Sequence, residues 1–546
     1  MGALDPETLE MLLESVREYA GRHLDEERML FLDRNGELPK MELDDMYDHN
    51  ILGVHLLLIP EKFGGAGAGV FDIYRICEEL ARIDLGVATA VFASFLGMDP
   101  IREGGTREQQ EYWFNRLAEE GLLIAYCATE PEAGSDLGAL TTIAVPVREN
   151  GELIGYRISG SKQWISNGAI ADMFLVLAKD PAAVGWFIVE GDREGITRGA
   201  PEDKHGIRAA NTSSVTFDNV YVPKENLVGM VEGQGLTQAQ AVFGFTRLMV
   251  AAFGLGAGWE ALERAIRYSQ TRIQAGTPLS EKQGYVHKLL VDNAVRLEAG
   301  RSYIEYVARR LDGDEEGLQT EGAIAKYMST DAGNRAAEDA IQALGGYGYV
   351  REYMVEKLKR DVRITQIYEG TNEMLEMTIT RNRWQEHLKS RGSYYLDSAR
   401  RMRELHERVN DAGALICSLT MESMASIMEE CRINRLTRNQ YVMMKLGRLI
   451  AMAEASMSFC LSSSLDDYPD SIRFPPDVYR AMSRSYAREV ARIVAAEGTA
   501  MVIGYGEEGN ENILDSSGYA EVMAAQIGMM EDREIVSRGL MEAFRG

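Results

Sequence analysis

The sequence is long, acidic and of ordinary hydrophobicity. It has 546 residues, of which 45% are hydrophobic and 26% are charged, and a net charge of −26. This length exceeds what one hydrophobic core normally organises, so we expect several domains. The composition excludes a disordered or fibrous chain. The negative charge argues against nucleic acid as a partner, because the average field repels a polyanion.

The cysteines and the N-terminus indicate where the protein works. Five widely spaced cysteines, none in a CxxC pair, are typical of buried thiols in a reducing compartment: Cys77, Cys127, Cys417, Cys431 and Cys460. Residues 1–13 are acidic and lack the basic start and apolar run of a signal peptide. No apolar run is long enough to span a bilayer, and no Arg-rich transit peptide is present. We expect a cytoplasmic protein, or a processed mitochondrial one, with membrane binding unfavoured and no metal.

Residues 1–121 are predicted to form an N-terminal α domain. Apolar residues recur at helical spacing over Pro6–Arg22, Met41–Leu52, Val70–Ile83 and Glu108–Ala118. The Gly-rich stretch Ile59–Gly67 is predicted to be a loop. It is not a phosphate cradle, because no strand precedes it and no P-loop lysine follows.

Residues 122–236 are predicted to form a β domain, either a barrel or a sandwich. Short runs rich in β-branched and aromatic residues alternate with Gly, Asn and Asp turns. The expected strands are Thr141–Val147, Leu153–Ser159, Phe174–Ala178, Gly185–Val189 and Ser213–Val222.

The helical period returns in residues 237–390, which we expect to form a four-helix-bundle domain. Its predicted helices are Ala239–Ser269, Lys282–Arg310, Gly322–Leu344 and Glu352–Arg363. The fold class is therefore α+β multidomain.

Residues 391–546 are predicted to form a further helical extension. Its expected helices are Ala412–Glu430, Leu436–Leu461, Val478–Ile503 and Ala520–Ala543, with a hinge at Pro475-Pro476 and a loop at Gly504–Gly509. It is rich in methionine, which indicates a core or interface face more than a ligand site. Without a polybasic face it is a poor lipid anchor.

The segment Ile367–Glu373 carries a candidate catalytic acid. Glu369 stands between an aromatic residue and a glycine, directly after a charged helical run. A carboxylate held in a dry pocket can remove a proton next to a carbonyl, because burial raises its pKa toward the working pH. A solvated turn between two helices is the alternative interpretation.

Three further segments give this acid a context. They are Tyr126–Asp136, Gly160–Gly168 and Gly345–Tyr349. In this order and spacing, from about Leu9 to Arg383, the chain resembles the acyl-CoA dehydrogenase family. The resemblance implies an α, β, α architecture and bound FAD, with Glu369 as the base. It also implies that the Glu369 amide and a ribityl hydroxyl of FAD hold the thioester oxygen. Some relatives carry the base on another helix, where this chain has Thr246, which cannot act as one.

The resemblance implies a set of FAD contacts. Thr129 and Ser166 would meet the ring nitrogens, while Trp164 would lie along the ring edge; a core position is the alternative for Trp164. Arg272 and Gln283 would bind the pyrophosphate, and Gln342 to Gly346 would come from a neighbouring subunit. The full implied set is Tyr126, Ala128, Thr129, Gly134, Ser135, Trp164, Ile165, Ser166, Arg272, Gln283, Gln342, Gly345, Gly346, Thr371 and Glu373.

Substrate contacts are implied in the same way. They are Ser135, Phe245, Arg247, Tyr368, Gly370 and Arg381. The chain departs from the family at Ile273–Gly276, where members commonly have Lys-Thr-Phe-Gly, and at Gly244, where many have Asp. Packing on the adenine side and contacts to the CoA nucleotide are therefore expected to differ.

The implied reaction is FAD-dependent α,β-dehydrogenation of an acyl-CoA thioester to the trans-2-enoyl-CoA, with electrons passed to electron-transferring flavoprotein. The alternatives are an acyl-CoA oxidase that uses oxygen, and a catalytically vestigial flavin-binding assembly subunit. Gly86–Met98, which reaches the far end of the acyl pocket in the family, is apolar and free of arginine. It favours a medium-to-long or bulky apolar acyl group over a dicarboxylate. The extension is similar to that of very-long-chain acyl-CoA dehydrogenases and implies a homodimer.

Overall fold

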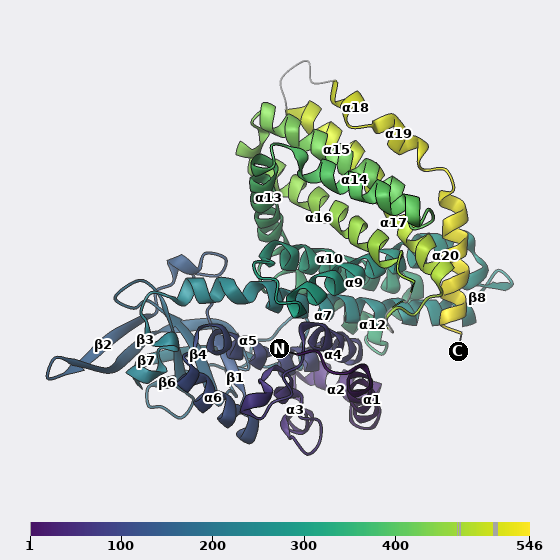
Figure 1. Cartoon of the computed structure of the whole chain (residues 1–546). Helices are drawn as coiled ribbons and strands as arrows, with labels where there is room; N and C mark the ends of the chain where they lie inside the picture. The colour runs from purple at the N-terminus through teal and green to yellow at the C-terminus, as the bar shows by residue number, and fades with distance from the viewer. Residues whose placement is uncertain (1, 467, 469–470, 506–511, 546) are drawn as a thin grey trace. The chain divides into compact units, whose positions relative to one another are not determined.

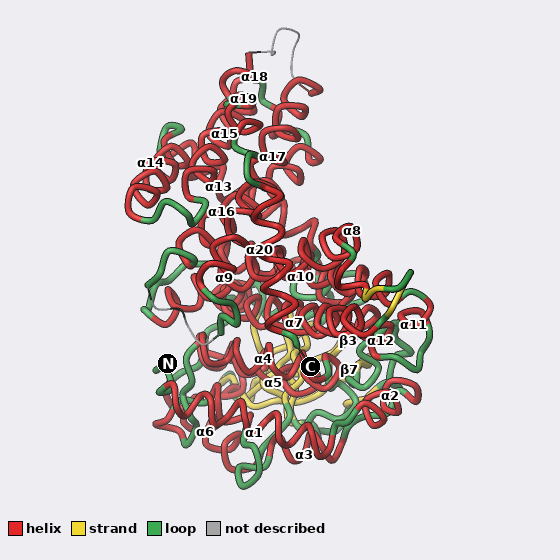
Figure 2. Tube along the Cα trace, turned by 90° about the vertical axis from the view of Figure 1, so that its right-hand side faces the viewer, coloured by secondary structure: helices red, strands yellow, loops and turns green. Residues whose placement is uncertain are grey.

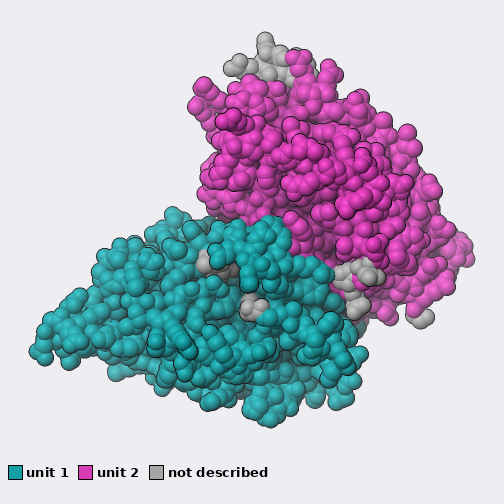
Figure 3. All heavy atoms as spheres, viewed as in Figure 1, with its two compact units in different colours: residues 1–257, 308–319, 360–364 teal, residues 258–307, 320–359, 365–546 magenta. Residues whose placement is uncertain are grey.

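The structure is a computed structural model that describes residues 2–466, 468, 471–505 and 512–545, except the side chains of 241–243. The chain divides into two compact units (Figure 3). Unit 1 comprises residues 1–257, 308–319 and 360–364. Unit 2 comprises residues 258–307, 320–359 and 365–546.

Unit 1 begins with helices whose ends are set by local signals. Asp5 caps the first helix by accepting a 2.9 Å hydrogen bond from the amide of Thr8. The predicted helix Val70–Ile83 is confirmed with the same bounds. The predicted helix Met41–Leu52 is shorter in the structure and ends at Tyr47. The helices are α1 Pro6–His23, α2 Glu26–Asn35, α3 Lys40–Tyr47, α4 Val70–Ile83, α5 Leu85–Gly104 and α6 Arg107–Glu120 (Figure 1).

Helix α5 contains the apolar segment Gly86–Met98 and is buried on nearly every side. A helix that is apolar all round belongs in a core. Because it has no amphipathic period, the sequence pattern did not predict it as a helix. Helix α2 was missed as well.

The β part of unit 1 is a two-sheet sandwich, as expected. One sheet has the order β1-β4-β5 and the other β2-β3-β7-β6. Their facing side chains, among them Phe174, Phe187 and Phe217, form one hydrophobic core. The strands are β1 Ile124–Cys127, β2 Ile143–Glu149, β3 Glu152–Ser166, β4 Met173–Ala178, β5 Gly185–Glu190, β6 Ile196–Arg198 and β7 Thr212–Pro223. Strand β3 is much longer than its predicted core and carries the Trp164 segment at its end.

The helical bundle starts with α7, Gly235–Thr271. It is the one helix found among the described residues that is long and apolar enough to cross a membrane, and its apolar window is entirely buried, as in a core helix. The predicted helix Lys282–Arg310 is divided by a π-helical turn, His287–Val291. The other elements are the hairpin β8 Ile273–Gln274 and β9 Thr277–Pro278, then α8 Gln283–Val286, α9 Asp292–Asp312, α10 Gln319–Leu344, α11 Gly346–Tyr349, α12 Met354–Val362 and α13 Asn372–Lys389.

The regular secondary structure in the described part of the extension is all helical. One prediction was wrong: Ala520–Ala543 is two helices, because Gly528 takes a left-handed φ of 87° between them. Pro476 is the first residue of a helix, a position that proline tolerates. Most of the predicted Gly504–Gly509 loop lies outside the described residues. The helices are α14 Ser393–Arg408, α15 Ala414–Ile433, α16 Gln440–Ser462, α17 Pro476–Tyr505, α18 Ile513–Ser516, α19 Tyr519–Ala524 and α20 Met529–Ala543.

Within unit 2 the extension and the bundle share one interior. Helices α15, α16 and α17 lie side by side (Figures 1 and 2), and α13 packs against α16. Arg383 of α13 forms ion pairs with Glu454 of α16 at 2.6 Å and Glu321 of α10 at 3.0 Å. Met421, Met424 and Met428 are buried, as expected for a methionine-rich core. All the cysteines are buried and free, as expected.

Candidate active site

Glu369 lies on a strained loop of unit 2 that leads directly into α13. Its φ is +54°, in the left-handed region that non-glycine residues seldom adopt, and Gly370 follows at +93°. Thr371 then caps α13 by accepting a 3.4 Å hydrogen bond from the amide of Met374. Left-handed non-glycine residues cluster at functional sites, since surrounding structure must hold them there. Glu369 itself is half-buried, and its backbone is held in this left-handed conformation.

A buried lysine holds this loop in place. The Lys326 ammonium, on α10, donates to the carbonyl oxygen of Gly370 at 2.7 Å and to Oδ1 of Asn372 at 3.2 Å. Its side chain is fully buried. Lys326 was not predicted as a site residue from the sequence. Its signal was a basic residue within a run of small, apolar and aromatic residues, 322–328.

In unit 1 the segments of Thr129 and Trp164 lie next to each other. The amide of Gln163 donates to the carbonyl oxygen of Thr129 at 3.0 Å. A break in register between Lys162 and Ile165 interrupts β3 here, and Trp164 takes a φ of +56°. Such a bulge re-aims a side chain. Trp164 is 60% exposed, so it is not a core residue.

The ends of these two segments are tied together by a buried ion pair. The Lys162 ammonium donates to Oε1 of Glu130 at 2.8 Å and to the carbonyl oxygens of Leu177 at 2.7 Å and Ala128 at 3.2 Å. Glu130 in turn accepts from the amide of Thr141 at 2.6 Å. Burial alone would raise the pKa of Glu130, but Lys162 and the threonine donors outweigh it and lower that pKa to about 2. The pair was not recognised from sequence.

The remaining unit 1 candidates take different surroundings. Thr129, Ser166 and Tyr126 are half-buried, and the Tyr126 ring lies 4.8 Å from that of Trp186. Ala128 is buried, while Gly134 and Ser135 are exposed. The Ile165 side chain belongs to the sandwich core, which leaves only its backbone for a cofactor.

Helix α5 contacts both the segment that follows Trp164 and the start of α7. Nδ2 of Asn167 donates to the carbonyl oxygen of Ala90 at 2.8 Å. The Arg102 guanidinium lies 4.9 Å from the ring centroid of Phe245 and pairs with buried Asp99 at 2.9 Å. Arg247 donates to the carbonyl oxygen of Gln319 at 3.3 Å. Thr246 is buried.

The candidates in unit 2 lie mainly on its surface. Arg272 is exposed next to the β8–β9 hairpin, and Gln342, Gly345 and Gly346 are exposed at the end of α10. Gln283 is exposed but already donates a hydrogen bond to Glu534 of α20. Glu373 and Arg381, on α13, are exposed. Tyr368 and Thr371, in the loop before it, are half-buried.

Family models match most of the chain. The acyl-CoA dehydrogenase N-terminal domain matches residues 6–121, the middle domain 125–220 and the C-terminal domain 233–383. The acyl-CoA dehydrogenase of Bacillus subtilis (strain 168) is 37% identical over 380 residues, which cover 68% of this chain and 96% of the relative. The rat very long-chain specific acyl-CoA dehydrogenase is 35% identical over 357 residues, 63% of this chain and 54% of the relative.

Solved structures agree. Butyryl-CoA dehydrogenase from Megasphaera elsdenii superposes with a TM-score of 0.64 at 34% identity, covering 69% of this chain and 98% of the other. A chain in the structure of the electron transferring flavoprotein of Acidaminococcus fermentans has a TM-score of 0.64 at 31% identity, covering 70% of this chain and 99% of the other. An acyl-CoA dehydrogenase from Bacillus anthracis, complexed with FAD, superposes with a TM-score of 0.81 at 22% identity, covering 99% of this chain and 97% of the other. The similarity in fold to this structure therefore includes the extension.

The matched domains define an FAD-dependent oxidoreductase that acts on acyl-CoA thioesters. The chain belongs to the acyl-CoA dehydrogenase family.

Proposed function

We propose that the protein oxidises an acyl-CoA to its trans-2-enoyl-CoA, with Glu369 removing the α-proton. The observation that supports this most strongly is the loop geometry. The backbone of Glu369 lies in the left-handed region, and the carbonyl oxygen of the next residue, Gly370, accepts a hydrogen bond from Lys326. Glu369 would take the α-proton, and the β-hydrogen would leave as hydride, so that the two electrons of the broken bond leave the substrate. The Glu369 amide would donate to the thioester oxygen, which stabilises the developing enolate.

The residues present fit FAD. Bound FAD would supply the hydride acceptor. An exposed Trp164, kept out of the core by a bulge, lies beside the half-buried Thr129 and Ser166, so a flat ring has both an apolar edge and hydroxyl partners. On unit 2, Arg272 and Gln283 would bind the diphosphate, with Gln342 to Gly346 contributed to a second subunit. Such guanidinium and amide donors are suited to phosphate.

The acyl group is proposed to be apolar and medium to long, or bulky. The buried α5 segment Gly86–Met98 supports this, and Arg102 beyond it is already paired with Asp99. A terminal carboxylate placed there would have no free cation partner on this segment of α5, which is costly in a buried site.

The electron acceptor is proposed to be electron-transferring flavoprotein, and the protein a cytoplasmic homodimer. Anaerobic titration of the FAD enzyme with a panel of acyl-CoAs tests the reaction. We expect bleaching with octanoyl-CoA in preference to glutaryl-CoA, and reoxidation by electron-transferring flavoprotein. Absence of bleaching with every acyl-CoA would favour the vestigial subunit, and stoichiometric hydrogen peroxide in air would favour the oxidase.

A further inference from the structure

The C-terminal helix α20 contacts both flanks of the β8–β9 hairpin beside Arg272. The hairpin itself is short, because each strand has two residues. Its turn places Ala275 at a φ of +49° and Gly276 at +89°. Residues 271–276 are all exposed. An isolated pair of strands this short is marginally stable, so its position must be set by what holds its ends.

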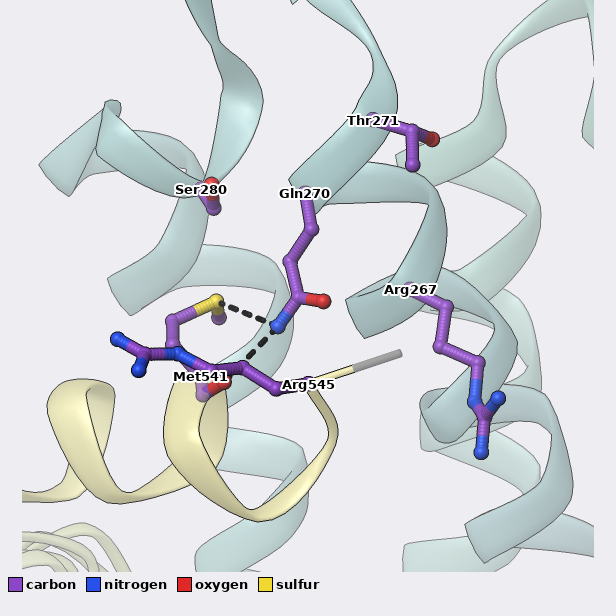
Figure 4. A pocket seen from close by; sticks show the side chains of 6 residues that line it. All are labelled: Arg267, Gln270, Thr271, Ser280, Met541 and Arg545. Carbon is purple, nitrogen blue, oxygen red and sulfur yellow. Dashed lines mark hydrogen bonds between the residues drawn. The ribbon is translucent and has the colours of Figure 1, made fainter.

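On the α7 side, α20 is joined to the residue two positions before Arg272. Nε2 of Gln270 donates to the backbone carbonyl oxygen of Met541 at 3.0 Å and approaches its sulfur at 3.8 Å (Figure 4). Deeper in unit 2, the Phe544 ring lies 5.9 Å from that of buried Trp259. The end of α20 is thereby fixed to the end of α7.

On the other side, α20 is joined to the segment that carries Gln283. Glu534 accepts a hydrogen bond from Nε2 of Gln283. Arg533 donates to the carbonyl oxygen of His287 at 2.7 Å and pairs with Asp292 at 2.7 Å. These are contacts to consecutive turns of α8, the π-helical turn and α9.

A cavity of about 570 Å³ lies where α20 meets the base of the hairpin. Figure 4 shows its lining: Arg267, Gln270, Thr271, Ser280, Met541 and Arg545. Thr271 and Ser280 flank the hairpin on either side, and the lining carries the guanidinium of Arg545 and that of Arg267, which pairs with Glu263 at 2.7 Å. The surroundings of the hairpin are therefore compatible with a negatively charged group.

We propose that α20 is a positioning element for the diphosphate half of FAD, which holds the Arg272 hairpin and orients the Gln283 amide. This proposal rests on the proposed function of Arg272 and Gln283. The reason is preorganisation: a hairpin that is already fixed loses less conformational entropy when the cofactor binds.

The test is a titration of FAD into apo-protein, with the dissociation constant as the readout. Glu534→Ala and Gln270→Leu each remove one contact of α20, and each is expected to weaken FAD binding roughly tenfold. Glu534→Gln keeps an oxygen acceptor for Gln283 and is expected to stay near wild type. Glu531→Ala removes an exposed carboxylate of the same helix and serves as the matched control. Excess FAD is expected to restore turnover of both weakened variants.

Arg272→Ala distinguishes a failure of the proposed role of α20 from a failure of the diphosphate assignment. If Arg272→Ala weakens FAD binding while Glu534→Ala and Gln270→Leu do not, α20 has no positioning role and the proposed function stands. If wild type itself binds no FAD, or Arg272→Ala has no effect, the diphosphate assignment fails first. Equal weakening by Glu531→Ala and Glu534→Ala would also overturn the role of α20. Should Glu534→Ala fail to fold, Gln270→Leu alone decides.

Discussion

The ammonium of Lys326 donates a 2.7 Å hydrogen bond to the carbonyl oxygen of Gly370, the residue after Glu369. A fully buried cation on α10 thus holds the backbone of the Glu369 loop from a distant part of the sequence. Through its second bond, to Asn372, it also holds the first residue of α13. The position of the proposed base, Glu369, therefore depends on contacts between α10 and the start of α13.

Lys326→Met is expected to slow flavin reduction by acyl-CoA roughly 100-fold, because a small displacement of a positioned base is costly. FAD content should remain near wild type, since Lys326 contacts the loop. Stopped-flow absorbance under anaerobic conditions measures the rate. Lys326→Gln, which retains a donor, should recover part of it. Equal rates for wild type and Lys326→Met would show that the loop does not depend on this bond.

Glu369→Gln is expected to lower the rate of flavin reduction by roughly three orders of magnitude or more, because it removes the proposed base while keeping the shape of the side chain. Glutamine can adopt the same left-handed backbone, so FAD binding should persist. Glu376→Gln is a matched control on α13. Burial raises the pKa of Glu376, which accepts a hydrogen bond from Tyr327 at 2.9 Å. Bleaching retained in Glu369→Gln but lost in Glu376→Gln would transfer the base to Glu376.

Lys162→Met is expected to destabilise the protein by about 3–5 kcal/mol, because it leaves the buried Glu130 carboxylate without its cation. The double variant Lys162→Met/Glu130→Gln should recover much of this loss. Chemical denaturation followed by tryptophan fluorescence measures it. A single-variant loss below about 1 kcal/mol would contradict a buried pair and would be typical of an exposed one.

The same pair predicts a pH dependence. The folded pKa of Glu130, about 2, is below its unfolded value of about 4.3. Its contribution to stability is therefore fully present above the unfolded pKa and is lost as the pH falls toward 2. Glu130→Gln should flatten the fall in unfolding free energy between about pH 5 and pH 2. Identical acid profiles for the variant and wild type would be evidence against the assignment.

Gly447→Ala is expected to destabilise by about 1–3 kcal/mol, because a Cβ there would lie 2.2 Å from the carbonyl oxygen of Glu376 and force α16 away from α13. Gly21→Ala is the control. Nothing lies within 4 Å of a Cβ at Gly21 inside α1, so alanine should stabilise that helix by roughly 0.5–1 kcal/mol. Thermal melts compare the two. A neutral Gly447→Ala would mean that α13 and α16 are less closely packed than the structure has them.

Truncation after Arg391 is expected to expose the surface that the extension covers in the proposed homodimer, and so to cause aggregation. It deletes Glu454, so Arg383 keeps only Glu321 of its buried carboxylate partners. Light scattering of the intact chain should give the mass of a dimer. A tetramer, or a truncated chain with unchanged assembly and solubility, would contradict this account of the extension.

Much of this protein could be read from local patterns. Val70–Ile83 has a helical period and forms a helix with the predicted bounds. The pattern of short β-branched and aromatic runs predicted β2, β3, β4, β5 and β7 of the sandwich, but not the short strands β1 and β6. The acid of Glu369, its flanking glycine and the family resemblance were also visible in the sequence. These features depend on neighbouring residues, so short-range information is enough to find them.

The tertiary structure decided the rest, because the relevant partners are far apart in sequence. Lys326 is 44 residues from Gly370, and Lys162 is 32 residues from Glu130. Neither bond has a periodic signature. Trp164 is exposed because β3 loses register with β7, which depends on pairing and not on its own composition. The contact between Glu534 and Gln283, 251 residues apart, exists only because the extension folds back onto the bundle and buries its apolar faces there.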